Sequence, residues 1–453
     1  MSFFVRKSNK FRVKKKDDKK QKKKKAVEFE VSSDSEDDAE INGNLRKRAI
    51  EESESEIEET AQEKKVRLAK KYLENIERQE KERLDDNLVD EAVNARLKDE
   101  VLEKSGYLFK RIANTYLPPN EDDIRYLKNG HKLPVTCVCV SNDSLYIYSA
   151  SKDCSIIKWC LNTGKKIKII PGGRKGTEKS HVGHSACVNC LAISSDDKFL
   201  ASGCDNKVIN IWNPETMELL KSFSGHRDVV TGVAFRKSTH TLYSCSRDKS
   251  VKVWNLDEMI YVETLFGHQE PITAIDSLLR ERTITAGGRD RSIRVWKIIE
   301  ESQLIFEGHN GSIDCVKLID ENHFVSAGED GSICLWDTSK KKPVTEVPHA
   351  HGATTSTSNW ISSLAVLVNS DLFASGSNDG VIRFWKCSDF KKIDEMFIVS
   401  AIGFVNCMQF SANGEYLVAA IGQEHRLGRW WRLKEAKNSV IIIPLRRKNE
   451  EDQ

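Results

Sequence analysis

The residues that could carry out chemistry in this chain are serine, histidine and aspartate side chains that recur at fixed distances from a tryptophan. Gly-His pairs precede six tryptophans, with the order reversed in the last, at Gly130-His131, Gly183-His184, Gly225-His226, Gly267-His268, Gly308-His309 and His351-Gly352. In five copies an aspartate stands six residues before the tryptophan, as Asp153, Asp248, Asp290, Asp330 and Asp379. A serine stands four residues before that turn position in five copies, as Ser149, Ser202, Ser244, Ser326 and Ser375. A catalytic Ser-His-Asp triad would occur once, so we interpret the recurring set as structural. We expect a buried hydrogen-bond chain, in which aspartate holds histidine and histidine reaches the hydroxyl and the indole.

The spacing of the tryptophans predicts the fold. The set is Trp159, Trp212, Trp254, Trp296, Trp336, Trp385 and Trp430, separated by 53, 42, 42, 40, 49 and 45 residues. WD40 repeats run about 40 to 45 residues and give one four-stranded propeller blade each. We therefore predict an all-β, seven-bladed WD40 β-propeller over residues 124–446.

Some copies depart from the pattern, and copies one, three and five are the most complete. Copy two has Asn206 at the aspartate position, copy four has Ala286 for the hydroxyl, and copy seven has Glu424 with no upstream Gly-His pair. Two segments could supply the outer strand that closes the ring: Ile124 to Leu127, or Ser439 to Leu445. The second is more strand-like, but the first precedes the first Gly-His pair, where an outer strand normally lies.

Composition separates the propeller from a charged tail. Every proline and all 12 cysteines fall after residue 117, and the formal net charge of +3 hides this division. No signal peptide and no run of about 20 apolar residues is present, so we expect an intracellular protein with no membrane contact. Cys187-Val-Asn-Cys190 is the one pair with metal-like spacing, and we interpret it as strand packing because a second such pair is missing. We expect no metal and no cofactor.

Residues 1–59 are predicted to be a disordered tail that carries a nuclear and nucleolar targeting signal. Its lysine clusters are Lys14, Lys15, Lys16, Lys22, Lys23, Lys24 and Lys25. A nuclear import receptor could read them, although lysine runs also serve as solubilising tails. Serines within acidic stretches are candidate phosphorylation sites for an acidophilic kinase: Ser32, Ser33, Ser35, Ser53 and Ser55. An unmodified acidic spacer is the alternative.

Residues 60–105 are predicted to form a charged amphipathic helix. Thr60-Ala61-Gln62-Glu63 is a capping box, no Gly or Pro follows before Ser105-Gly106, and apolar residues recur at spacings of three and four. The apolar stripe is too thin for a core, so we expect the helix to dock onto a partner or along the propeller. Residues 106–123 are a linker, and residues 447–453 are a disordered C-terminus.

The turns between second and third strands should emerge on one face and make it basic over one arc. The arc contains Lys152, Lys207, Arg247, Lys249, Arg289 and Arg291, whereas blades five and six supply Glu329, Asp330, Asn378 and Asp379. The blade-seven turn adds Gln423, His425, Arg426 and Arg429. Clustered basic residues on a rigid disc indicate phosphate-backbone binding, although surface basic residues are also common by chance. Arginine suits phosphates or a guanine edge, and histidine can stack on an unpaired base. Alternatively, Glu424 and His425 repair the hydrogen-bond set that blade seven lacks.

Four stretches resemble one known family. They are Glu63-Lys64-Lys65-Val66-Arg67-Leu68-Ala69-Lys70-Lys71-Tyr72-Leu73, Lys152-Asp153-Cys154-Ser155-Ile156-Ile157-Lys158-Trp159, Tyr261-Val262-Glu263-Thr264-Leu265-Phe266-Gly267-His268 and Gly422-Gln423-Glu424-His425-Arg426-Leu427-Gly428-Arg429-Trp430-Trp431. In these stretches the chain resembles the U3 small nucleolar RNA-associated WD40 proteins of the small-subunit processome. The last stretch is the most specific, because the repeat itself does not demand it.

The resemblance implies a non-catalytic subunit of a box C/D ribonucleoprotein. Such a subunit would recognise the B/C motif of U3 small nucleolar RNA beside the kink-turn-binding core protein, together with other small-subunit processome proteins, and support early pre-ribosomal RNA cleavages in the nucleolus. A nuclear WD40 scaffold that reads acidic or phosphorylated peptides would use the same basic face. An enzyme is disfavoured, because no unique nucleophile, metal cluster or carboxylate pair stands apart from the repeat.

Overall fold

The computed structural model describes the chain except for residues 1–60, 82–88, 175, 177–180, 355–356 and 449–453. The tail with its targeting lysines and candidate phosphorylation sites therefore lies outside the described residues, as do Thr60 of the capping box and the end of the C-terminus.

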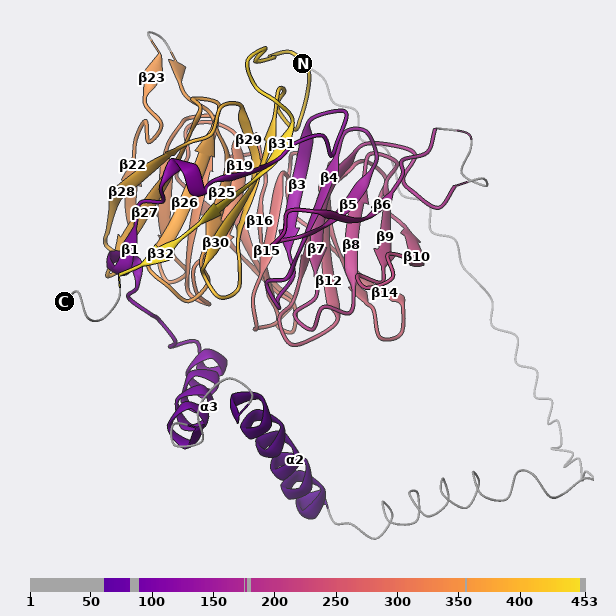
Figure 1. Ribbon diagram of the computed structural model, residues 1–453, viewed down its shortest axis with the longest axis vertical. Coiled ribbons are helices and arrows are strands. Elements are labelled where there is room, and N and C mark those ends of the chain that lie inside the picture. Colours follow the sequence, from indigo (N-terminus) through magenta and orange to yellow (C-terminus); the bar gives the residue numbers. More distant parts are fainter. Residues whose placement is uncertain (1–60, 82–88, 175, 177–180, 355–356, 449–453) are drawn as a thin grey trace, which may run out of the picture. The chain divides into compact units, whose positions relative to one another are not determined.

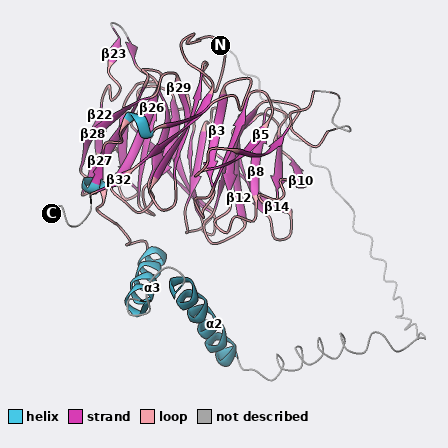
Figure 2. Cartoon of the chain, in the orientation of Figure 1, coloured by secondary structure: helices cyan, strands magenta, loops and turns pink. Residues whose placement is uncertain are grey.

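Seven antiparallel four-stranded sheets form the blades of a propeller, which confirms the predicted fold (Figures 1 and 2). The first strands of neighbouring blades lie side by side around a central channel. They are β3 (Val135–Val140), β7 (Val188–Ile193), β11 (Val230–Phe235), β15 (Ala274–Ser277), β19 (Ile313–Leu318), β25 (Ile361–Val366) and β29 (Phe404–Phe410). The second strands are β4 (Tyr146–Ser151), β8 (Leu200–Cys204), β12 (Thr241–Ser246), β16 (Arg282–Ala286), β20 (His323–Gly328), β26 (Leu372–Ser377) and β30 (Tyr416–Gly422).

The third and fourth strands complete each blade toward the outside. The third strands are β5 (Ile156–Cys160), β9 (Val208–Trp212), β13 (Ser250–Asn255), β17 (Ser292–Lys297), β21 (Ile333–Asp337), β27 (Val381–Ser388) and β31 (Ser439–Pro444). The outer strands are β6 (Lys166–Ile170), β10 (Leu219–Ser224), β14 (Ile260–Phe266), β18 (Ser302–Glu307), β22 (Thr345–Val347), β28 (Lys392–Ser400) and β2 (Arg125–Leu127). A short hairpin of β23 (Ala353–Thr354) and β24 (Thr357–Ser358) precedes blade six.

Blade seven is closed by the N-terminal candidate. Strand β2 pairs with β31, with Tyr126 opposite Ile441, and β31 pairs with β30. Of the two candidates left open by the sequence, residues 125–127 form the outer strand, and the more strand-like segment at 439–445 forms the third strand. Its continuous apolar run Val440–Ile443 is buried as a third strand, whereas β2 has only one buried residue, Leu127. A run that is buried on both sides belongs inside a sheet rather than at its edge.

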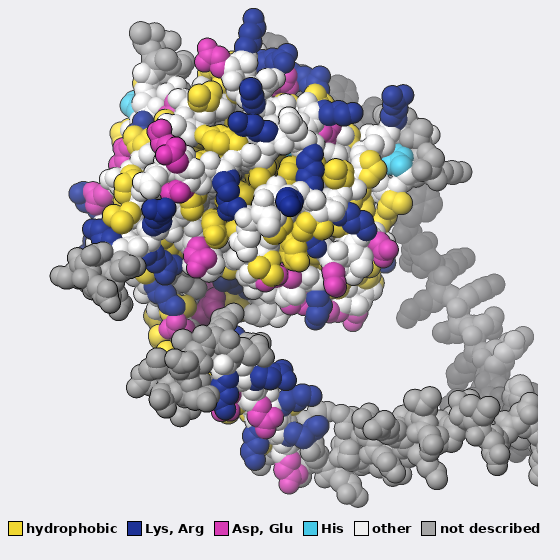
Figure 3. Space-filling view, in the orientation of Figure 1, with side chains coloured by type: hydrophobic (Ala, Val, Ile, Leu, Met, Phe, Trp, Pro, Cys, Tyr) yellow, Lys and Arg dark blue, Asp and Glu magenta, His cyan; other side chains and the backbone are white. Residues whose placement is uncertain are grey.

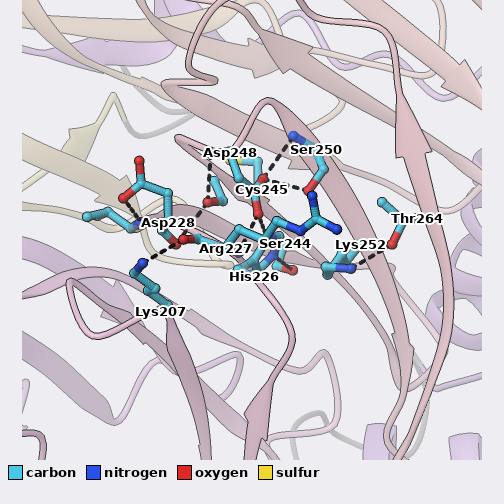
Figure 4. Close-up of polar contacts among 12 residues, drawn as sticks. Lys207, His226, Arg227, Asp228, Ser244, Cys245, Asp248, Ser250, Lys252 and Thr264 are labelled. Atoms are coloured by element: carbon cyan, nitrogen blue, oxygen red, sulfur yellow. Dashed lines mark hydrogen bonds and ion pairs between the residues drawn. The ribbon is translucent and has the colours of Figure 1, made fainter.

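The hydroxyl that links the histidine to the indole is present in six blades, and the full chain with its aspartate is clearest in blade three (Figure 4). In blade two Asn206 takes the aspartate position and bonds Ser185 instead of His184. Ser244 Oγ accepts from the indole N–H of Trp254 at 2.9 Å and lies 2.8 Å from His226 Nε2. His226 Nδ1 lies 3.0 Å from Asp248. Burial alone would raise the pKa of Asp248, but hydrogen bonds from His226 and Ser250 outweigh it and hold that pKa well below its usual value. The hydroxyl therefore stands between indole and imidazole, where its removal would leave two buried groups without a partner.

Individual blades complete the chain differently from the sequence expectation. In blade four Thr285, not residue 286, bonds both His268 and Trp296, at 2.8 Å each, because one extra residue separates the hydroxyl from the tryptophan. Blade six is complete despite its reversed His-Gly order, with His351 2.8 Å from Asp379. Blade one is less complete than expected, since His131 Nδ1 bonds Ser155 at 2.9 Å and lies 3.5 Å from Asp153.

Blade seven has no such chain. Ala419 occupies the position of the serine, and Ile443, which pairs with Leu417, occupies the position of the tryptophan. Trp430 is not the repeat tryptophan that its spacing suggested, because it lies in the loop before β31 and is 64% exposed. The six repeat tryptophans of the other blades, Trp159, Trp212, Trp254, Trp296, Trp336 and Trp385, are 5% exposed or less.

The predicted helical region contains α2 (Ala61–Lys81) and α3 (Val89–Ser105). Helix α3 ends at Ser105, and the φ of 77° at the following Gly106 allows the amides of Gly106 and Tyr107 to bond the carbonyls of Glu103 and Leu102. This is the Schellman arrangement, which favours glycine. Neither described helix is long and apolar enough to cross a membrane.

Residues 94–123 belong to the same compact unit as the propeller. Glu103 pairs with Lys237 of blade three at 3.0 Å. The Asp371 carboxylate of blade six accepts from the amides of Ile112 and Ala113 at 2.8 Å each. Strand β1 (Tyr116–Leu117) then pairs with β32 (Arg446–Arg447), so the segment before the first blade is joined to the segment after the last.

We predict that Ser244→Ala destabilises the propeller by about 3 kcal/mol, because it leaves the Trp254 N–H and His226 Nε2 buried without partners. Thermal unfolding followed by circular dichroism measures the change. The exposed Ser302→Ala is the matched control and should unfold like the parent. Equal unfolding temperatures for Ser244→Ala and the control would contradict a stabilising role for the hydrogen-bond chain.

Candidate nucleic-acid interface

The turns between second and third strands share one backbone shape that fixes where their side chains lie. The aspartate accepts a hydrogen bond from the amide two residues later, as in Asp248 with Ser250 at 3.0 Å. The intervening residue takes a positive φ, 69° at Lys249 and 56° at Arg291. Glycine fits this conformation best, and blades five and six use Gly331 and Gly380 there. We call the surface formed by these turns in blades one to six the turn face.

The lysines of the predicted basic arc are bonded within the protein. Lys207 Nζ donates to the Arg227 carbonyl at 2.6 Å, as Figure 4 shows, and Lys249 Nζ donates to the Gln269 carbonyl. Each thus reaches the Gly-His loop that enters the next blade.

Lys152 is held more tightly still, since its side chain is only 8% exposed. Its Nζ donates to the carbonyls of His425 at 2.6 Å and Gly428 at 3.0 Å, and lies 3.6 Å from Glu424. Burial lowers the pKa of Lys152, and the Glu424 carboxylate opposes that shift. The lysine therefore holds the turn of blade seven in place.

The arginines of the arc are exposed. Arg247, Arg289 and Arg291 lie on the turns of blades three and four and are exposed to solvent. Arg429 of blade seven is 66% exposed and lies 3.5 Å from Glu424. On the side of the propeller seen in Figure 3, basic side chains are mixed with apolar and acidic ones. The arginines of the turn face are therefore the part of the predicted track that can reach a ligand without breaking a contact.

The blade-seven loop, residues 423–438, replaces the short turn of the other blades. Gln423 closes its base, because its Nε2 donates to Ala436 O at 2.7 Å and its Oε1 accepts from Arg432 at 2.9 Å. Leu433 N–H donates to Gln423 O at 2.9 Å. These hydrogen bonds give the loop a defined fold.

His425 and Arg426 turn inward from this loop. His425 is 2% exposed, and its ring stacks on Trp360 with centroids 4.2 Å apart. Burial, then the nearby charges of Arg426 and Lys152, lower its pKa to about 3, so the ring is neutral at physiological pH. Arg426 Nη2 donates to the Asp314 carbonyl at 2.6 Å and lines the central channel, whose volume is about 440 Å³.

Asp314 and Trp360 complete this cluster, and sequence reasoning missed both. The Trp360 indole N–H donates to Asp314 Oδ2, so blades five and six together hold the blade-seven loop. Trp360 directly follows residues 350–359, which lengthen the spacing between the fifth and sixth repeat tryptophans, and only its position beside this irregular segment could have drawn attention to it. Burial raises the pKa of Asp314 to about 6, and the charge of Arg426 opposes the shift.

A cavity of about 300 Å³ lies between the blade-seven loop and the turns of blades one to three. Its lining includes Lys152, Arg247, Arg426 and Arg429, together with Asp205 and Asn189. The structure thus brings four of the predicted RNA-contact residues together, while Lys207, Lys249, Arg289 and Arg291 lie outside this cavity.

Buried polar atoms without a hydrogen-bond partner concentrate in the same place. Within the described part of the chain there are seven such side-chain atoms. Four belong to this cluster: Asn406 Oδ1, Glu424 Oε2, His425 Nε2 and Arg426 Nε. Native proteins leave few buried polar groups unpaired, so the blade-seven loop is the strongest candidate for binding a polar ligand.

Comparisons with known proteins agree with this architecture. The family described as "WD domain, G-beta repeat" matches residues 124–160, 176–213, 217–255, 260–297, 300–337 and 344–386, and so leaves out the divergent blade seven. The chain is 51% identical to U3 small nucleolar RNA-interacting protein 2 of Mus musculus over 86% of this chain and 83% of the relative. It is also 51% identical, with the same coverage, to the protein of that name from Homo sapiens. The crystal structure of RRP9 WD40 repeats superimposes with a TM-score of 0.70 at 52% identity and covers 73% of this chain and all of that one.

We predict that Asp314→Asn stabilises the protein at pH 7.5 but not in acid. The raised pKa means that the folded state favours the neutral carboxyl of Asp314. The stability that this carboxyl contributes to folding is therefore complete below about pH 4 and is lost as the pH rises through 6. Asparagine keeps an acceptor for Trp360 without the buried charge, and the gain above pH 6 is at most about 3 kcal/mol. Thermal unfolding from pH 4 to 8 measures it. A difference from the parent that is independent of pH would contradict this account.

Proposed function

Because the chain belongs to the family of U3 small nucleolar RNA-interacting WD40 proteins, we propose that it is a subunit of the U3 ribonucleoprotein that supports ribosomal RNA processing and small ribosomal subunit biogenesis. The observation that carries the proposal is the 51% identity over 86% of the chain. The expected location is the nucleolus.

The proposed RNA surface is the turn face together with the blade-seven loop. Arg247, Arg289, Arg291 and Arg429 are exposed there, and a guanidinium can form paired hydrogen bonds with phosphate oxygens or a guanine edge. Lys207 and Lys249 add positive charge beside them while bonded to backbone carbonyls. Lys152 and Gln423 support the surface by fixing the loop.

His425 and Arg426 were predicted to contact RNA, and their burial favours a supporting role instead. A neutral, 2% exposed imidazole stacked on Trp360 cannot stack on a base unless the loop opens. Arg426 lines both the channel and the 300 Å³ cavity, so a phosphate in that cavity could still meet its unpaired Nε. We therefore propose that His425 orders the loop and that Arg426 contacts only a ligand group that enters the cavity.

At a finer level, we propose that the RNA element is the B/C motif of U3, bound beside the kink-turn-binding box C/D core protein and other small-subunit processome proteins. The proposed role is non-catalytic. The Ser-His-Asp sets support this, since they recur in several blades and each is built into the hydrogen bonding of its own blade.

The charged tail would serve transport and regulation. Lysine clusters of the kind found at 14–25 are read by nuclear import receptors, and phosphates on Ser32, Ser33, Ser35, Ser53 or Ser55 would add negative charge beside them.

We predict that changing Arg247, Arg289 and Arg291 together to alanine weakens binding to a U3 B/C transcript. Each of these arginines that binds a phosphate should account for about one unit in the slope of log affinity against log salt, so the slope should become shallower in the triple variant. Filter binding between 50 and 300 mM salt measures both the affinity and the slope.

The matched control changes Lys340, Lys341 and Lys342 to alanine, which removes the same charge from the connection between β21 and β22. This control should bind like the parent. Equal weakening of both variants would indicate a general effect of net charge. If the parent binds acidic or phosphorylated peptides tightly and the transcript no better than unrelated RNA, the peptide-reading alternative holds.

We predict that deletion of residues 1–48 removes nucleolar accumulation but leaves affinity for the transcript unchanged, because the lysine clusters lie outside the repeats. Fluorescence imaging of the tagged deletion variant and filter binding of the purified protein test the two parts. Restoration by an unrelated nuclear import signal is the control. Normal accumulation of the deletion variant in cells depleted of its processome partners would contradict the targeting role.

A further inference from the structure

Two neighbouring tryptophans in the blade-seven loop are exposed to solvent. Trp430 is 64% exposed and Trp431 is 43% exposed. Tryptophan gains most from burial among the side chains, so large exposed aromatic surfaces mark binding sites. Neither indole belongs to the hydrogen-bond chains of the repeat, and neither was among the residues predicted to contact RNA.

Both rings are fixed against the propeller. Trp430 lies nearly parallel to Trp360, with centroids 6.4 Å apart and an interplanar angle of 16°. Trp431 meets Phe404 edge to face at 5.4 Å. A Cβ at position 428 would fall 1.6 Å from the Trp430 ring, so only glycine lets the indole fold back over the chain there. The loop therefore presents the rings in a set orientation, which reduces the entropy that binding would otherwise cost.

The charges around these rings favour one class of ligand. Residues 428–437 contain four basic side chains, Arg429, Arg432, Lys434 and Lys437, and one acidic residue, Glu435. All four basic side chains are exposed to solvent at least in part. Exposed aromatic faces between basic groups suit single-stranded nucleic acid, whose bases stack on the rings while the cations lie along the phosphates.

We propose that unpaired nucleotides of the bound RNA stack on Trp430 and Trp431, with Arg429 and Arg432 beside their phosphates. This inference rests on the proposed function and adds that the loop binds RNA that is unpaired. The turn face would follow the phosphate backbone, and the tryptophan pair would distinguish an unpaired segment from a continuous duplex. Because every base has a π-face, the pair confers a preference for unpaired structure and little preference for sequence.

The test compares Trp430→Ala, Trp431→Ala and the double variant with the parent on two RNAs. One is a U3 B/C transcript with its unpaired nucleotides, and the other is a blunt duplex of similar length. Affinity for the transcript should fall about tenfold for each tryptophan removed, with an unchanged salt slope because the charge stays the same. Affinity for the duplex should not change. Phenylalanine at either position should restore most of the binding, since stacking needs only an aromatic face.

The control is Phe266→Ala, which removes a ring that is 73% exposed on outer strand β14. It should bind both RNAs like the parent. Thermal unfolding identifies any variant that fails to fold, and the phenylalanine variants then carry the comparison.

Two results would overturn the inference: parent-like affinity of the folded double variant for the transcript, or equal weakening on the transcript and the duplex. Loss of a processome protein from the double variant with normal RNA affinity would also overturn it, in favour of a protein-docking role. Failure of the proposed function looks different, because the parent itself would then not prefer the transcript over unrelated RNA.

Discussion

The propeller depends on one interaction, in which a buried hydroxyl forms hydrogen bonds with both an indole and an imidazole. In six blades it connects the third strand, the second strand and the loop that enters the first strand, and all of its partners are buried. Removing one member leaves the others unpaired in an apolar setting, where the cost is highest. The turn between second and third strands therefore has one shape and emerges on one face. Repetition of this constraint turns separate sheets into a rigid disc with a regular turn face.

Blade seven lacks this hydrogen-bond chain, and the candidate RNA-binding site lies in its loop. Ala419 and Ile443 replace the polar members, so this blade relies on apolar packing and on pairing between β31 and the N-terminal strand β2. No histidine ties down its second-to-third-strand connection, which leaves room for the long blade-seven loop. Other blades hold that loop instead, through Lys152 of blade one, Asp314 of blade five and Trp360 of blade six. Because other blades hold it, this loop contains buried polar atoms without hydrogen-bond partners and the two exposed rings of Trp430 and Trp431. The short turns of the other blades have no room for such groups.

Lysine and arginine have separate uses on the turn face. Lysine has a compact ammonium on a flexible stem, and Lys152, Lys207 and Lys249 each reach a backbone carbonyl of another blade. Arginine presents a planar fork that is suited to phosphate, and Arg247, Arg289, Arg291 and Arg429 remain exposed. In the sequence, lysines and arginines alike add to one predicted basic arc. In the structure, the lysines mainly join blades and the arginines face solvent.

The sequence by itself determined the seven-bladed propeller, the structural role of the Ser-His-Asp sets and the end of α3 before Gly106, because each depends on short-range spacing or on one residue's backbone preference. Only the tertiary structure decided which segment closes the ring, since β2 and β31 are far apart in the chain and both can form strands. It also showed that Thr285 supplies the hydroxyl of blade four, where one extra residue shifts the register, and that Trp430 is exposed although its spacing fits the repeat. His425 and Arg426 face inward for the same kind of reason. Their environment is made by Asp314 of blade five and Trp360 of blade six, which reach the blade-seven loop only when the blades assemble around the channel. Local sequence spacing carries no trace of these contacts.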